Sequence, residues 1–132
     1  LHDAQSAHRL QEKPTGHARR GSSGMPGPGY SNIEILGGNG DLESLIKATP
    51  KGLLVTSLMG HSPDMITGDY SRGASGFWIE NGECVFPVEE ITIAGSMQEM
   101  MMNIDMLGAD LDRRGAFQAP SLRIAAMTVS GK

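Results

Sequence analysis

The stretch GFWIENGECVFPVEEITIAG, residues 76–95, decides the fold of this chain. The pair Asn81-Gly82 near its centre favours a two-residue type I′ turn, because both central positions of that turn need a positive φ. Apolar residues alternate on both sides of the pair: Phe77 and Ile79 before it, Cys84 and Phe86 after it. The stretch therefore predicts a β-hairpin.

The second strand of this hairpin contains Pro87 and is predicted to continue to Ala94. Because proline has no N–H to donate, the strand should lie at a sheet edge near Pro87, or break there. Ile91 and Ile93 are expected on one face, since side chains two residues apart in a strand point the same way.

Upstream of the hairpin the pattern predicts several short elements. Residues 1–13 suit a short helix that Pro14 ends, and residues 14–31 are almost all turn and loop residues. We then expect a strand over residues 32–36, a short helix with Asp41 as its N-cap, and a buried strand over residues 53–59.

Downstream of the hairpin, Ser96 and Glu99 have the spacing of a capping box, which predicts a helix start. Six apolar residues then follow at helical spacing, and we expect this methionine-rich stripe to be core rather than a binding face. They are Met97, Met100, Met101, Ile104, Leu107 and Leu111. Arg113 and Arg114 suit the C-terminus of that helix, and residues 121–129 predict a last strand. The order predicts one α+β domain over residues 1–132, β-rich, with a mainly antiparallel sheet and a few short helices.

Composition and charge exclude some classes of function. The net charge of the 132 residues is −4, but residues 1–20 carry +2 and residues 21–132 carry −6. An acidic body lacks the electrostatic footprint of a nucleic-acid-binding protein. No stretch approaches 18 consecutive apolar residues, so we expect no membrane span. A single cysteine, Cys84, cannot form an internal disulfide, which favours a reducing, cytoplasmic location.

No residue pattern singles out a catalytic or metal site. The four histidines, His2, His8, His17 and His61, lie outside any HExxH or HExxxH motif. His61 with Asp64 and Asp69 could hold a metal, but a hydrogen-bonded or solvated loop histidine is the commoner case. Cys84 has no cation next to it in the sequence that would activate its thiol, so a buried apolar role is expected. We assign no catalytic and no metal-binding residue to this chain.

The loop before the hairpin gathers the remaining polar candidates. We expect residues 61–75 to include a loop that contacts a peptide or a partner subunit. Its candidate contact residues are His61, Asp64, Asp69, Tyr70, Ser71 and Arg72. The alternative is a structural role, with Arg72 pairing with Asp69 to fix the turn.

The segment KGLLVTSLMGHSPDMITGDYSRGASGFWIENGECVFPVEEITIAG, residues 51–95, resembles the C-terminal part of the TldD/PmbA family, in its PmbA (TldE) branch. The similarity extends to SAHRLQEKPTGHA (6–18), PGPGYSNIEILGG (26–38), NIDMLGADLD (103–112) and APSLRIAAMTVSG (119–131). Members are about three times as long as this chain, so it looks like the last third of such a protein. The family is also labelled as modulators of DNA gyrase.

The resemblance implies one half of a cytoplasmic, heterodimeric zinc metalloprotease. Such TldD–TldE pairs degrade unfolded or leader peptides, in peptide maturation and antitoxin turnover. The TldD-type subunit carries an HExxxH helix and a C-terminal cysteine ligand, which the TldE-type subunit lacks. The matching place here, residues 112–124, has no cysteine, and Cys84 lies far upstream.

The sequence is therefore interpreted as the C-terminal domain of a non-catalytic PmbA/TldE-like subunit. We expect no cofactor in this chain and zinc in a TldD-type partner. The expected partners are that subunit, or a second copy through self-association, and an unfolded or extended peptide, with no nucleic acid and no membrane. The alternatives are a self-sufficient metallopeptidase subunit and a regulator of DNA gyrase.

Overall fold

The computed structural model describes residues 1–60 and 63–131. The chain forms two compact units, each with its own internal contacts. Unit 1 consists of Leu1–Ile35 and Asp112–Gln118, and unit 2 of Leu36–Leu111 and Ala119–Lys132. No helix among the described residues is long and apolar enough to cross a membrane.

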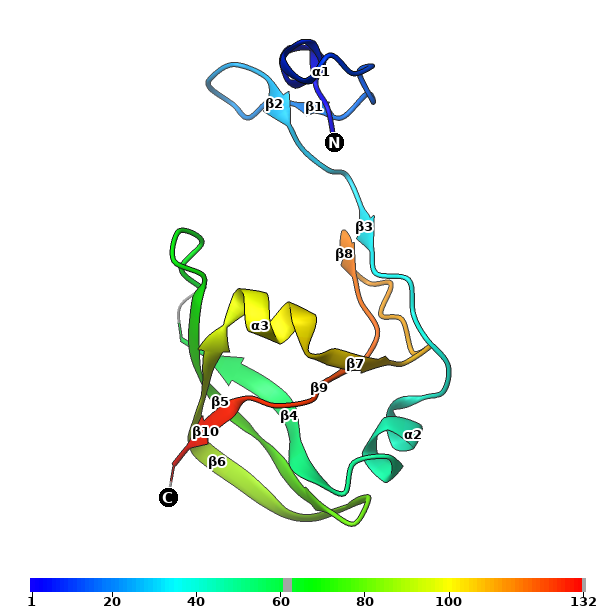
Figure 1. The fold of residues 1–132 in the computed structure, drawn as a ribbon, viewed down its shortest axis with the longest axis vertical. Helices are drawn as coiled ribbons and strands as arrows, with labels where there is room; N and C mark the ends of the chain where they lie inside the picture. Colours follow the sequence, from blue (N-terminus) through cyan, green and yellow to red (C-terminus); the bar gives the residue numbers. More distant parts are fainter. Residues whose placement is uncertain (61–62, 132) are drawn as a thin grey trace. The chain divides into compact units, whose positions relative to one another are not determined.

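Unit 1 contains one helix and two short pairs of strands (Figure 1). The predicted N-terminal helix is confirmed as α1 (Ala4–Leu10), where the Asp3 carboxylate accepts a hydrogen bond of 2.7 Å from the Ser6 N–H. The segment expected to be only loop contains a small antiparallel pair, β1 (Ala18–Arg19) with β2 (Gly27–Pro28). The next pair is parallel and joins β3 (Ile33–Glu34) to β8 (Phe117–Gln118).

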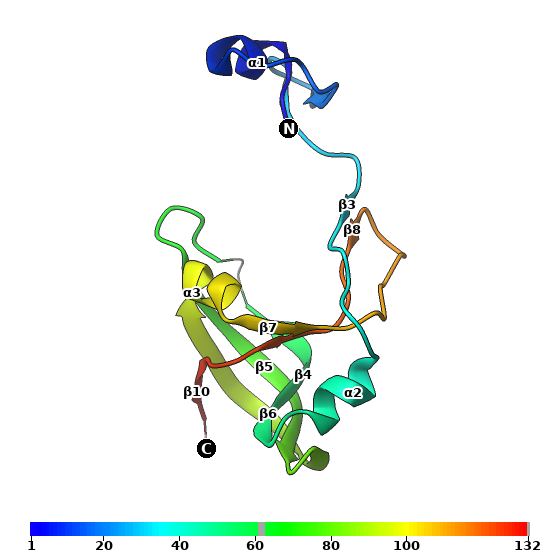
Figure 2. The ribbon, with the colours of Figure 1, turned by 45° about the vertical axis from the view of Figure 1, so that its right-hand side comes forward.

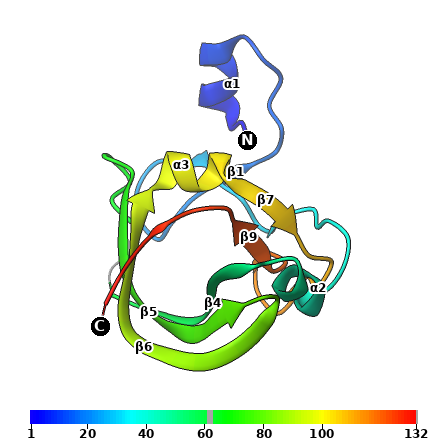
Figure 3. The ribbon, with the colours of Figure 1, turned by 60° about the horizontal axis from the view of Figure 1, so that its bottom comes forward.

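Unit 2 is organised by a four-stranded antiparallel sheet in the order β10-β6-β5-β4. The strands are β4 (Lys51–Met59), β5 (Asp69–Glu80), β6 (Glu83–Ser96) and β10 (Thr128–Ser130). Figure 3 shows that β4, β5 and β6 are strongly bent, so the sheet has a concave face. The concave side faces the two-stranded ladder of β7 (Ile104–Leu107) and β9 (Leu122–Ile124), and helix α2 (Leu42–Lys47) (Figures 2 and 3).

The predicted hairpin is confirmed. Asn81 and Gly82 have φ of 50° and 80°, as a type I′ turn requires, and join β5 to β6. Pro87 stays paired with Phe77, while β10 pairs with β6 only at residues 92–94. Among the described residues β6 therefore has a free edge at Pro87, which confirms the predicted edge position without a break.

The centre of the core is a cluster of Ala74, Ile91 and Ile93, which are 0%, 7% and 6% exposed. Ile91 and Ile93 share one face, as predicted. Next to the turn, the alternating pattern predicts that Phe77 and Ile79 share one face of the strand. This prediction is wrong, because Phe77 is exposed while Ile79 is buried. A register shift at this point leaves Val85 without a partner in the ladder, and such a bulge turns side chains to the other face. Cys84 is consequently exposed, and its predicted buried role is wrong.

Two predictions about the other elements of unit 2 have opposite outcomes. The helix predicted after Asp41 is confirmed as α2, where the Asp41 carboxylate accepts a 2.9 Å hydrogen bond from the Ser44 N–H and Leu45 is buried. The burial predicted for residues 53–59 is wrong. They form most of β4, but no residue of β4 is buried. An edge strand on a bent sheet has too little protein around it to enclose its side chains.

The long methionine-rich helix is also a wrong prediction. Helix α3 (Met97–Met102) is only six residues long, has no buried residue, and its Ser96 makes no side-chain capping bond. At Ile104 the chain becomes β7, because residues 104–107 pair with β9. Arg113 and Arg114 lie in unit 1, outside any helix, and the single strand expected over residues 121–129 is two strands, β9 and β10.

The predicted fold class is confirmed. The described strands pair antiparallel except for β3 with β8, and the three helices among the described residues are short. The β-rich α+β architecture therefore follows the prediction, although one helix is shorter and the sheet more open than expected.

Candidate functional site

A cavity of about 930 Å³ lies on the concave side of unit 2 and is the best candidate for a binding site. Most of its lining is apolar and comes from α2, β4, β5 and the segment that joins β9 to β10. The lining includes Leu45, Leu53, Val55, Leu58, Tyr70, Ile79, Ile93 and Met127. Volume, apolar walls and a few polar groups are typical of sites that take small molecules or peptide side chains.

Strand β4 borders this cavity and is an edge of the sheet. It pairs with β5 on one side, and no backbone hydrogen bond joins it to another strand among the described residues. An edge strand presents a row of free N–H and C=O groups to any extended chain that comes near. A free β4 edge beside an apolar cavity therefore offers both halves of a peptide site: backbone pairing and pockets for side chains.

The polar part of the cavity lining is an ion pair between Arg123 on β9 and Asp105 on β7. The guanidinium makes two hydrogen bonds to the carboxylate, of 2.9 and 2.7 Å, and a third of 2.7 Å to the Ala48 carbonyl oxygen at the end of α2. These bonds lower the pKa of Asp105 and raise that of Arg123. Arg123 thus ties the end of α2 to the β7–β9 ladder, and residues of all three elements line the cavity.

We expect the thermal stability of unit 2 to fall in acid. The Arg123 guanidinium lowers the pKa of Asp105, and the Ser121 hydroxyl lowers that of Asp110, from 3.8. A lowered folded-state pKa stabilises the fold above the unfolded-state pKa, and this stabilisation is lost as the pH falls through the folded-state pKa. The melting temperature should therefore be level above about pH 5 and fall below pH 4, and Asp105→Asn should show a smaller fall.

The control for this pH experiment is Glu99→Gln, which removes an exposed carboxylate that has no ion-pair partner among the described residues. It should follow the pH profile of the unsubstituted protein. Melting curves between pH 2 and 6, read by circular dichroism, provide the measurement. An equal fall in melting temperature for Asp105→Asn and the unsubstituted protein would show that the ion pair with Arg123 contributes nothing to the loss of stability in acid.

The polar residues predicted as a contact loop are spread over two structures. Asp69, Tyr70, Ser71 and Arg72 form the start of β5, so the loop ends earlier than expected. Of these four, only Tyr70 lines the cavity, and it is half-buried. His61 lies outside the described residues. The predicted peptide or partner contact remains a prediction.

Two of these residues shape the turn that precedes β5. The Asp64 carboxylate accepts hydrogen bonds from the N–H groups of Ile66 and Thr67, at 2.7 and 3.2 Å, and these donors lower its pKa. The Asp69 carboxylate accepts a 2.8 Å bond from the Thr67 hydroxyl. The turn is therefore held by hydrogen bonds to the carboxylates of Asp64 and Asp69.

Arg72 has a structural role that differs from the one considered. Its guanidinium donates to the carbonyl oxygens of Met59 and Gly60, both at 3.4 Å, and so closes the end of β4. Its expected partner, Asp69, bonds to Thr67 instead. The pairing of Arg72 with Asp69 is thus replaced by a contact across two strands.

The donor set of the described residues does not fit a catalytic zinc, which needs three protein ligands around one point. Residues 1–60 and 63–131 contain no group of three or more His, Cys, Asp or Glu placed to hold a metal ion. Cys84 stands exposed on β6.

Sequence reasoning missed the cavity and its ion pair. Asp105 and Arg123 are 18 residues apart, and Arg123 bonds to Ala48, 75 residues away. The only available signal in the sequence was a carboxylate at Asp105 and a guanidinium at Arg123. The long helix predicted over residues 97–111 placed Asp105 on a helix, so its pairing with Arg123 across two short strands was not predicted.

Known proteins are similar to this chain over almost its whole length. A sequence model of the family described as "PmbA/TldA metallopeptidase C-terminal domain" matches residues 1–131. Metalloprotease PmbA of Escherichia coli O157:H7 is 43% identical over 127 residues, which are 96% of this chain and 26% of that protein. The chain therefore spans about a quarter of the length of this curated relative.

Solved structures have the same fold. A protein from Thermotoga maritima MSB8, named as a candidate modulator of a DNA gyrase, superimposes with a TM-score of 0.85 at 30% identity, over 98% of this chain and 30% of that one. TldE from Thermococcus kodakarensis gives a TM-score of 0.82 at 24% identity, over 98% of this chain and 30% of that one. The second likeness bears on the fold alone.

Proposed function

Because the chain belongs to the PmbA/TldD metallopeptidase family, as its C-terminal domain, we propose that it holds peptides for a zinc centre carried by another subunit. It is the C-terminal domain of a non-catalytic PmbA/TldE-type subunit. Its partner is a TldD-type subunit, and the pair degrades unfolded or leader peptides in the cytoplasm, in peptide maturation and antitoxin turnover.

The observation that carries this proposal is the free β4 edge beside the apolar cavity. A peptide that adds to the edge of β4 gains hydrogen bonds from its backbone, so its affinity depends little on its sequence. Alternate side chains of the added strand then face the cavity, where Leu53, Val55 and Leu58 offer apolar contact. Unfolded peptides of varied sequence are the substrates that such a surface suits.

The choice of a non-catalytic role is supported by the donor set. The described residues bring no three metal ligands together, and a catalytic zinc takes three protein ligands. In the proposal the zinc belongs to the TldD-type partner, and the turn around Asp64 with the start of β5 is the part that meets that partner.

We expect peptide cleavage to require both subunits. Mixing the intact protein with a TldD-type partner should raise cleavage of an unfolded peptide at least about tenfold over either subunit alone, with the zinc found in the partner. Asp69→Ala should weaken assembly, while Glu83→Ala, an exposed carboxylate beside the hairpin turn, should not.

Other results would favour a self-sufficient metallopeptidase or a gyrase regulator, or would exclude the start of β5 from the partner interface. About one zinc per intact protein, together with cleavage in the absence of a partner, would favour a self-sufficient metallopeptidase. The gyrase name of the Thermotoga maritima relative is tested by a supercoiling assay, and a change in gyrase activity without cleavage would favour a regulator. Full assembly and cleavage by Asp69→Ala would exclude the start of β5 from the interface.

A further inference from the structure

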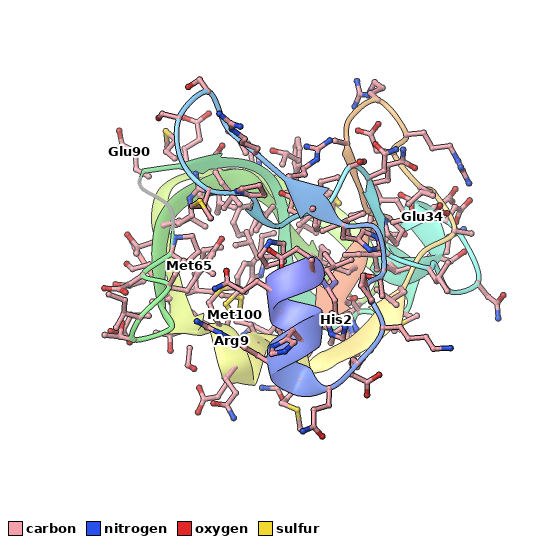
Figure 4. All side chains as sticks on the ribbon, turned by 90° about the horizontal axis from the view of Figure 1, so that it is seen from above. His2, Arg9, Glu34, Met65, Glu90 and Met100 are labelled. Carbon is pink, nitrogen blue, oxygen red and sulfur yellow. The ribbon has the colours of Figure 1, made fainter. Side chains whose placement is uncertain are left out.

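One end of unit 2 exposes large apolar side chains on a turn and on a short helix. Met65 and Ile66, at the tip of the turn before β5, are 85% and 95% exposed, and Met101 and Met102 on α3 are 61% and 82% exposed. We call these four residues the methionine surface. Figures 1 and 3 show the turn next to the start of α3, and Figure 4 labels Met65 on the turn and Met100 on α3.

The two elements are held together by backbone bonds. The Gly68 carbonyl oxygen accepts a 2.8 Å hydrogen bond from the Met97 N–H, which ties the turn to the first residue of α3. Within the turn, the Gly68 N–H donates to the Asp64 carbonyl oxygen at 2.9 Å. The base of the turn is therefore joined to the start of α3 by a backbone hydrogen bond, and the turn itself is closed by a second one.

The charges around this surface are negative. Asp64, Asp69 and Glu99 are exposed at this end, and the neighbouring cation, Arg72, is turned to the carbonyl oxygens at the end of β4. Unit 2 as a whole has eleven Asp and Glu against four described Lys and Arg. All four of these cations already have a contact within the unit: Lys47 with Glu43, Lys51 with the Trp78 ring, Arg72 with β4, and Arg123 with Asp105.

We propose that the methionine surface binds a cationic amphipathic segment of a partner protein. Methionine side chains adapt to apolar side chains of varied shape, and large exposed apolar patches mark interaction sites. Lys and Arg of the segment face Asp64, Asp69 and Glu99, which have no cationic partner in the described part of unit 2. A second copy fits less well, since a symmetric contact would place these carboxylates against each other. This proposal rests on the proposed function, which places the same turn at the TldD-type partner, and it adds the chemistry of the segment that the turn binds. The probe peptides test that chemistry without the partner, so a failure of the probes is distinguishable from a failure of paired cleavage.

The experiment uses two fluorescent probe peptides of about 14 residues, one a helix of Leu and Lys and the other of Leu and Glu. Anisotropy titration of the intact protein should show binding of the Leu/Lys probe only, with weaker binding as salt rises from about 50 to 300 mM. The double substitution Met65→Ser with Ile66→Ser should weaken that binding at least about tenfold. Glu99→Gln should weaken it about two- to fivefold.

The matched controls lie at the hairpin end of the same sheet. Val85→Ser and Glu83→Gln replace a 50% exposed apolar residue and an exposed carboxylate, and should leave the affinity unchanged. Equal binding of the two probes, or equal losses at Val85 and at Met65 with Ile66, would overturn the proposal. Dimerisation of the intact protein that Met65→Ser with Ile66→Ser abolishes would also overturn it, because the occupant would then be a second copy.

Discussion

Alanine in place of Gly76 is expected to lower the free energy of unfolding by about 3 kcal/mol, the upper part of the range for overpacked sites. Gly76 is buried in β5 and pairs with Val55 of β4. A Cβ atom at this position would overlap the Leu54 carbonyl oxygen and its carbon. Because these are backbone atoms of the neighbouring strand, no rotamer change can make room, and β4 has to move.

The control for Gly76→Ala is Gly73→Ala in the same strand. A Cβ at Gly73 would meet the Met59 side chain at an ordinary contact distance of 3.5 Å. Gly73→Ala should therefore change stability by less than about 1 kcal/mol, and Gly76→Ala should lower the melting temperature by roughly 10 °C more than Gly73→Ala does. Urea unfolding followed by Trp78 fluorescence would give the free energy of unfolding of each variant, and thermal unfolding would give the melting temperatures. Equal stability of the two variants would show that the backbone of β4 can move at Leu54 without a measurable loss of free energy of unfolding.

The hairpin and the α2 start were predictable because each depends on residues that are close in sequence. Asn81 and Gly82 adopt the positive φ that asparagine and glycine tolerate. Asp41 caps α2 by accepting a hydrogen bond from the Ser44 N–H, three residues away. Such local chemistry acts the same way in any fold. The Pro87 edge position follows for the same reason, since the missing N–H belongs to the residue itself.

Residues 97–111 show where local patterns fail. Their apolar residues fit a helical period, yet the helix stops at Met102 because Ile104 pairs with Ile124, twenty residues away. A strand partner outside the window adds hydrogen bonds that no periodicity within the window can reveal. The methionine stripe was for this reason assigned to the core, whereas Met101 and Met102 are exposed.

The candidate site was even less predictable than α3. The cavity exists because a bent sheet and the β7–β9 ladder enclose it, and each wall comes from a distant part of the sequence. Of the residues expected to contact a peptide, Tyr70 lines the cavity, while Asp64 and Arg72 serve the turn and the end of β4. Polar residues in a Gly-rich loop are equally compatible with a binding site and with hydrogen bonds that hold the loop, so the sequence could not distinguish the two.

Leu58→Glu is expected to weaken binding of an extended peptide at least about tenfold, which corresponds to about 1.4 kcal/mol. Leu58 lies near the end of β4, opposite Ala74, and lines the cavity while remaining 40% exposed. A carboxylate there must be desolvated when an apolar peptide side chain enters the cavity, and that cost falls on the complex alone. Because Leu58 is already partly in water, the fold should tolerate the change.

Two controls distinguish binding of peptide side chains in the cavity from pairing of the peptide backbone with the edge of β4. Val85→Glu adds the same charge at a 50% exposed position outside the cavity lining, and it should leave peptide affinity unchanged. A neutral peptide methylated on alternate backbone nitrogens cannot pair with β4, and it should bind the unsubstituted protein at least about tenfold more weakly than its parent. If methylation has no effect while Leu58→Glu does, the cavity binds side chains without strand addition. If neither has an effect, the peptide binds elsewhere, because an occupant of this cavity has to pass Leu58 or the edge of β4.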